Sequence, residues 1–314
     1  MQKLLVTGVD GVAGSNLALA LATRFEVVGL YERHTVSFEG CRTSHCELAD
    51  EAKLADRIRE ESPAAIIHCG CWSKGTWDLR PSEPSTASMP DETRIVARMA
   101  ESAAAAKSWL AVLSTDAVFS GPRLFHEEDA ATLDSGMASS AIGMERTALA
   151  RGAMVVRTHP YGWSPVEHEC GFAERVWRSL TDNVPCRCVH EHHATPILAT
   201  DLAAFLARSW EMRLTGLYHI AGAERTSPAR FASELAAAFG LRGVACEPSD
   251  PLAGTVGASR PESSLSTRKV RRELKLPMPL LREGLDRFAD QAEKGFRARV
   301  RGAPRGGSVS GRAA

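Results

Sequence analysis

Three glycines near the start of the chain have the spacing of a phosphate-binding turn. Residues 3–14 run from an apolar stretch into Gly8, Gly11 and Gly14, and an Ala/Leu-rich stretch follows. A strand that ends in such a turn and continues as a helix brings backbone N–H groups to the pyrophosphate of a dinucleotide. We therefore expect Gly8, Gly11, Val12 and Gly14 to bind a dinucleotide, rather than to form a turn with a structural role alone.

The residue that closes the second strand of such a fold selects the cofactor. An acid there bonds a ribose hydroxyl of NAD, whereas a base accommodates the 2′-phosphate of NADP. This chain offers both, because Glu32 is followed by Arg33 and His34. The sequence leaves NADP and NAD open, with NADP preferred. Glu47, after the third predicted strand, is a candidate for the adenine side of the cofactor, or equally an ordinary acid at a helix start.

The proton donor that usually accompanies this turn is missing from the chain. Dinucleotide folds of this kind usually act with a tyrosine and a lysine four residues later. The three tyrosines, Tyr31, Tyr161 and Tyr218, are followed at the fourth position by threonine, proline and glycine. No Tyr-x-x-x-Lys exists in the sequence, so any reduction would need another acid.

A stretch rich in cysteine and histidine is a second candidate for chemistry. In an extended strand Cys186, Cys188, His190 and His192 would share one face, and their sulfur and imidazole donors suit zinc. Same-face ligands on one strand lie about 6–7 Å apart, however, and cannot converge on one ion. We therefore expect no metal site.

Short β-rich runs alternate with amphipathic segments along the chain. These strands and helices must position the candidate residues named above. Strands are predicted over 3–7, 26–31, 43–46, 64–70 and 109–114, and helices over about 14–24, 51–61, 92–107, 200–210, 227–239 and 279–293. This alternation predicts an α/β fold with a doubly wound parallel Rossmann sheet. A smaller C-terminal α/β substrate-binding lobe would follow.

The predicted organisation divides the chain into three parts. Residues 1–160 form the NAD(P)-binding domain and 161–293 form the substrate-binding lobe, with 195–212 returning to the first domain. Residues 294–314 carry arginines among Gly, Ala, Ser and Pro without an apolar period, which predicts a disordered basic tail.

The charge balance and the composition limit the kinds of partner that we expect for this protein. The 314 residues hold 38 basic and 38 acidic side chains, so no global charge favours nucleic acid or a membrane surface. No run of roughly 18 apolar residues predicts a transmembrane helix. No secretion signal is visible, and eight cysteines are then expected to be reduced thiols in the cytoplasm.

The order of the motifs resembles a known family. The chain is similar to extended short-chain dehydrogenase/reductases, and most of all to the dTDP-4-dehydrorhamnose reductase type. The segments that carry the resemblance are 7–14, Ile66-Ile-His-Cys-Gly70, Leu113-Ser-Thr-Asp-Ala-Val-Phe119, Val156-Arg157, Ala194-Thr-Pro196, 216–222 and Arg260-Pro261.

This resemblance implies roles for individual residues. Gly70 and Cys71 would line the nicotinamide, and Thr115 would bond the reacting oxygen of the substrate. Asp116 and Arg260 would contact the substrate. The tyrosine and lysine of the family should fall within 136–141, where this chain has only Gly, Met, Ala and Ser.

The same layout places the residues before Ala194 at the mouth of the substrate site. His192 or His193 could then contact a sugar or phosphate, and His192 could replace the missing acid, because imidazole titrates near neutrality. A plain loop is the other interpretation.

The resemblance therefore implies a protein that binds NAD(P) and a nucleotide sugar and reduces a 4-keto sugar by weakened chemistry. The alternative is a catalytically inactive regulatory or sensor subunit that acts through a protein partner. The resemblance also implies a homodimer, since members of this family usually form homodimers.

Overall fold

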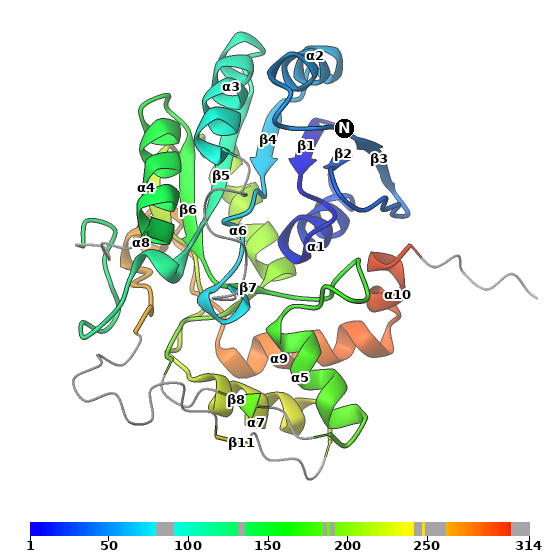
Figure 1. The fold of residues 1–314 in the computed structure, drawn as a ribbon, viewed down its shortest axis with the longest axis vertical. Coiled ribbons are helices and arrows are strands. Elements are labelled where there is room, and N and C mark those ends of the chain that lie inside the picture. The colour runs from blue at the N-terminus through cyan, green and yellow to red at the C-terminus, as the bar shows by residue number, and fades with distance from the viewer. Residues whose placement is uncertain are drawn as a thin grey trace, which may run out of the picture.

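Seven parallel strands form the centre of the molecule (Figure 1). The computed structural model describes residues 1–79, 91–130, 136–184, 187–188, 192–241, 247–248 and 262–302. The sheet order is β10-β6-β5-β4-β1-β2-β3, which confirms the predicted doubly wound α/β fold. The strands are β1 (Lys3–Thr7), β2 (Glu26–Tyr31), β3 (Cys41–His45), β4 (Ala65–His68), β5 (Trp109–Thr115), β6 (Met154–Thr158) and β10 (Gly216–His219).

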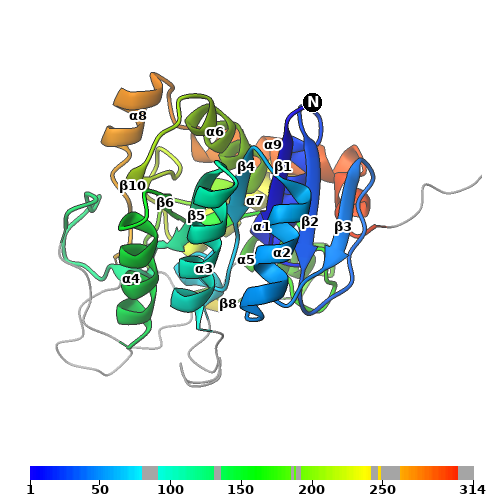
Figure 2. The same ribbon diagram turned by 90° about the horizontal axis from the view of Figure 1, so that it is seen from above.

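Helices cover both faces of this sheet (Figure 2). One face packs against α2 (Glu51–Glu61), α3 (Glu92–Ala105) and α4 (Gly136–Leu149), and the other against α1 (Val12–Leu21) and α6 (Ala199–Glu211). The apolar residues of β1 alternate between the two cores, since Leu4 and Val6 join one and Leu5 joins the other. A parallel sheet covered on both sides explains why its central strands read as continuous apolar runs.

The remaining elements form a smaller lobe around an aromatic core. It contains the helices α5 (Phe172–Thr181), α7 (Pro228–Ala238) and α9 (Leu281–Glu293), and the strand pairs β7 (Pro160–Tyr161) with β9 (Ile197–Leu198) and β8 (Arg187–Cys188) with β11 (Glu247–Pro248). Trp163 is fully buried there and stacks on Phe288 with 4.1 Å between ring centroids. Helix α8 (Arg268–Leu274) and two short 3₁₀ turns, η1 (Thr76–Asp78) and η2 (Asp116–Val118), complete the fold.

The chain beyond residue 294 differs from the expected disordered tail. Phe296–Val300 form helix α10, and Val300 is completely buried. Arg297 and Arg301 donate hydrogen bonds to the buried carboxylate of Glu174 over 3.2 and 2.6 Å. A charge taken out of water needs such partners, so these arginines fix the helix in place. Residues 303–314 of the predicted tail lie outside the described residues.

Within the described residues, no helix is both long and apolar enough to span a bilayer.

Candidate cofactor and substrate site

The glycine turn has the geometry of a close backbone approach. Gly8 has φ +66°, a conformation that favours glycine, and a Cβ there would overlap the carbonyl oxygen of Cys69. A Cβ on Gly14 would overlap the backbone of Gly8. Gly11 is the N-cap of α1, and no side chain caps the first turn. The first N–H groups of α1, from Val12 onward, therefore lack a side-chain acceptor and suit an anionic ligand.

The predicted cofactor-selecting residues lie in the loop after β2. Glu32 Oε1 accepts a hydrogen bond from the Leu48 N–H over 2.8 Å. Burial raises the pKa of Glu32, and the Leu48 hydrogen bond opposes this shift. The Arg33 and His34 N–H groups donate to Asp10 Oδ2 over 2.9 and 3.3 Å. Hydrogen bonds from two directions therefore fix the backbone of this loop beside the glycine turn.

Glu47 is an exposed residue between Cys46 and Leu48, whose N–H groups are hydrogen-bonded to Tyr31 and Glu32. Its carboxylate is 3.6 Å from Lys53 Nζ on α2. This position fits the interpretation as an acid at a helix start, and contact with adenine stays a prediction.

A buried chain of hydrogen bonds occupies the end of β4. Thr7 Oγ1 lies 2.7 Å from His68 Nδ1, and His68 Nε2 donates to Glu92 over 3.0 Å. The other oxygen of Glu92 accepts the Cys71 N–H over 2.5 Å. Burial opposes ionisation of Glu92, but the charge and hydrogen bond of His68 prevail and lower its pKa. Gly70 fits because a Cβ there would overlap the side chains of Glu92 and His68.

The thiol of Cys71 is not reactive in this setting. Burial raises its pKa, and the nearby charge of Glu92 raises it further. Cys71 therefore stays protonated near neutrality, and a redox role has no support from its surroundings.

A second buried network surrounds Asp116, at the carboxyl end of β5. The carboxylate accepts hydrogen bonds from the Thr76 N–H (2.8 Å) and hydroxyl (3.0 Å), and from the Ser263 hydroxyl (2.9 Å). It also accepts the His159 Nδ1–H over 2.7 Å. Asp116 is completely buried, and burial opposes its ionisation. The charge of His159 and these hydrogen bonds nevertheless hold its pKa below the usual range.

Asp116 therefore lies among protein donors rather than facing open space. A direct contact with substrate stays a prediction, whereas its hold on His159 is observed. Thr115, the preceding residue, is 1 % exposed and its hydroxyl accepts the Ala117 N–H over 3.0 Å.

The two predicted histidines lie against the same network. The His192 carbonyl accepts a hydrogen bond from Trp77 Nε1 over 2.9 Å, and the Trp77 ring packs edge-on against His159 at 4.6 Å. Burial lowers the pKa of His192, and the charge of Asp116 opposes this. The His193 carbonyl accepts the N–H and hydroxyl of Ser263 over 2.9 and 3.1 Å. Cys186, His190 and Arg260 lie outside the described residues.

Helix α4 begins where the family's tyrosine was expected, and among its described side chains no carboxyl group is left to replace that acid. Its buried residues include Ala138, Ala141 and Met144. Glu145 pairs with Arg157 through two hydrogen bonds of 2.9 and 2.7 Å, so its carboxylate is already in use.

His159 is the residue that the sequence motifs did not single out. It follows β6 directly and therefore lies at the carboxyl edge of the sheet, where ligands bind in open α/β folds. The signal that could have identified His159 from the sequence is a histidine immediately after a predicted buried strand.

Comparison with known proteins decides the family. Residues 1–294 match the model described as the RmlD substrate binding domain. The chain belongs to this family. The resemblance to dTDP-4-dehydrorhamnose reductases within the extended short-chain dehydrogenase/reductases is thereby confirmed.

One sequence relative and two solved structures are similar to this RmlD family member. A dTDP-4-dehydrorhamnose reductase of Streptomyces griseus is 26 % identical over 273 residues, 84 % of either chain. The dTDP-4-dehydrorhamnose reductase of Bacillus anthracis, solved with NADP, has a TM-score of 0.76 at 20 % identity, covering 93 % of this chain and 99 % of that one. The Bordetella bronchiseptica enzyme WbmH, solved with NAD⁺, has a TM-score of 0.71 at 16 % identity, covering 91 % and 96 %.

Proposed function

We propose that this chain binds NAD(P) and a sugar nucleotide and reduces a 4-keto sugar by a weakened form of the family's chemistry. The Streptomyces griseus relative supports the reaction, and the NADP-bound and NAD⁺-bound neighbours support the cofactor. The observation that carries the proposal is the buried Asp116–His159 pair, in which a histidine is hydrogen-bonded to the residue that follows Thr115.

The cofactor would lie along the carboxyl ends of β1, β2 and β4. Gly8, Gly11 and Gly14 let its pyrophosphate approach the uncapped N-terminus of α1. Arg33 and His34 are the side chains that would meet a 2′-phosphate, which favours NADP. Gly70 and Cys71 would border the nicotinamide.

When bound, the nicotinamide supplies hydride to the carbonyl carbon of the substrate. The Thr115 hydroxyl accepts from Ala117, so its own proton remains for the carbonyl oxygen. Asp116 fixes the Nδ1–H of His159, which leaves the other ring nitrogen to deliver a proton to the developing alkoxide. His192 is the second candidate for this step.

A binding experiment and a turnover experiment test this function. Titration with NADPH and NADH, followed by nicotinamide fluorescence, should show saturation with a preference for NADPH. Turnover of a dTDP-4-keto sugar should be slow, and Thr115→Val and His159→Asn should each reduce it by about 10²–10⁴-fold. The same assay on His192→Asn decides which histidine acts. A reaction that both histidine variants leave intact would contradict the proposed acid.

A catalytically inactive sensor subunit is the alternative, favoured because the acid in the described part of α4, Glu145, is already paired with Arg157. Saturable cofactor binding without turnover, together with a co-purifying protein, would support it. We further propose that the protein is cytoplasmic and forms a homodimer. Light scattering of the purified protein tests the dimer.

A further inference from the structure

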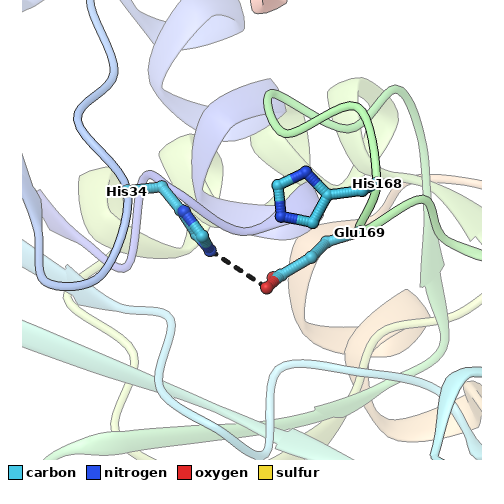
Figure 3. A group of neighbouring side chains, drawn as sticks. All are labelled: His34, His168 and Glu169. Carbon is cyan, nitrogen blue, oxygen red and sulfur yellow. Dashed lines mark hydrogen bonds and ion pairs between the residues drawn. The ribbon is translucent and has the colours of Figure 1, made fainter.

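Two histidines and a glutamate converge near the loop after β2 (Figure 3). His34 comes from that loop, and His168 and Glu169 come from the loop between β7 and α5. One ligand atom from each residue lies within 4.8 Å of the others. His34 Nε2 is 3.0 Å from Glu169 Oε1, and the two imidazole rings meet edge-on with 5.6 Å between centroids. Figure 3 shows all three side chains directed at a common point.

Neighbouring groups hold these ligands in position. Arg33 Nη2 donates to Glu169 Oε2 over 2.9 Å and Nη1 donates to Oε1 over 3.4 Å, so the guanidinium holds the carboxylate beside the histidines through both oxygens. The Ser164 hydroxyl donates to the Glu169 carbonyl over 3.0 Å, and Asp10 accepts the His34 N–H. Supporting bonds of this kind orient metal ligands and raise the affinity of a site.

The donor set and its spacing indicate the ion. Donors of a tetrahedral site lie about 2.0–2.2 Å from zinc, and so roughly 3.4 Å from one another. The observed separations, from 3.0 Å up to the 4.8 Å limit, reach that value with small side-chain rotations. Imidazole suits zinc and related transition ions, whereas magnesium and calcium prefer oxygen ligands alone.

We propose that His34, His168 and Glu169 bind one zinc ion, with water as the fourth ligand. The side chains of His34 and Glu169 are 30 and 35 % exposed, so an ion can enter from solvent. The bound ion would join the loop after β2 to the loop that precedes α5. None of its ligands belongs to the Asp116 network, but His34 also lies in the loop proposed to meet a 2′-phosphate, so zinc binding is measured without NAD(P).

Zinc titration of the full chain tests the site. Protein freed of metal by a chelator should bind one equivalent of zinc in calorimetry and keep it through gel filtration. His168→Ala and Glu169→Gln should each weaken zinc affinity at least about 10-fold, since even supporting residues contribute 10–100-fold. Glu167→Gln is the matched control, because Glu167 lies in the same loop, is 74 % exposed and pairs with Arg178 and Arg301 instead.

Cysteine ligation is the competing explanation for zinc uptake. Cys170 adjoins the cluster but its thiol is buried and directed at the Glu167 carbonyl. The cobalt-substituted protein should therefore lack thiolate-to-metal absorption, and Cys170→Ala should bind zinc normally. Zinc should also raise the melting temperature of the wild type and not of His168→Ala. No uptake by the wild type, or wild-type zinc affinity in both His168→Ala and Glu169→Gln, would overturn the proposal.

Discussion

Loss of one partner of the buried Glu145–Arg157 pair should destabilise the fold, because the pair has a structural rather than a catalytic role. Both side chains are nearly inaccessible, at 2 and 5 % exposure, and two hydrogen bonds join them. Glu145 also accepts the Ser114 hydroxyl over 2.6 Å. Glu145→Gln removes the negative charge and leaves the buried guanidinium without its counter-ion.

The expected loss follows from that burial. Removal of one partner of a buried ion pair costs about 3–5 kcal/mol, because the remaining charge stays desolvated. Glutamine retains one acceptor oxygen, so we expect a value near the lower end, about 3 kcal/mol. Asp286→Asn is the control, since Arg282 and Asp286 form a half-exposed pair that should contribute only about 0.2–1 kcal/mol.

Urea denaturation followed by circular dichroism measures both variants at pH 7. Arg157→Met should be similarly destabilising, and the double variant Glu145→Met with Arg157→Met should lose less than the two single variants together. If Glu145→Gln costs no more than Asp286→Asn, the pair is not desolvated and the reasoning fails. If it abolishes turnover while stability is unchanged, Glu145 is a catalytic group after all.

Burial and the charge of Arg157 lower the pKa of His219 to about 3, so the unfolded state takes up its proton first as the pH falls. Neutral His219 therefore contributes stability above pH 6.5, and this contribution falls by about 1.4 kcal/mol per pH unit below that value. His219→Leu should reduce the fall in urea midpoint between pH 7 and pH 5. The same pH dependence in the variant and the wild type would refute this assignment. Gly143→Ala should raise stability by about 0.5–1 kcal/mol in thermal melts, because the new methyl group on α4 would make only ordinary contact with Thr93 on α3. Gly14→Ala should instead abolish NAD(P)H binding in fluorescence titrations, because its Cβ overlaps the turn; normal binding would show that the turn is not the pyrophosphate site.

The sequence predicted those elements whose signals are local. Lys3–Thr7 and Glu51–Glu61 have the predicted bounds, because one is a continuous apolar run and the other follows Asp50, whose side chain caps the helix. Gly136–Leu149 was missed as a helix. Its Gly, Ser, Ala and Met residues give little amphipathic contrast, and packing against the sheet rather than intrinsic preference holds it.

The site was predictable only where a motif lies in one segment. Thr115 and Asp116 could be located from a single run of residues. The partners of Asp116 could not, because Thr76, His159 and Ser263 are 40, 43 and 147 positions away along the chain. No periodicity relates such residues, and only the sheet topology brings them together. The cluster of His34 with Glu169, 135 positions apart, escaped prediction for the same reason.

Helix α10 determines how far the chain can be truncated from its C-terminal side without loss of buried contacts. The family match ends at residue 294, yet the buried carboxylate of Glu174, which Arg178 contacts at 3.5 Å, makes its two shorter ion pairs with Arg297 and Arg301, beyond that point. A protein truncated at residue 294 would keep the whole family region and lose both cations together with the buried Val300. Protein production and limited proteolysis should therefore treat residue 302, not residue 294, as the earliest safe end of the folded chain.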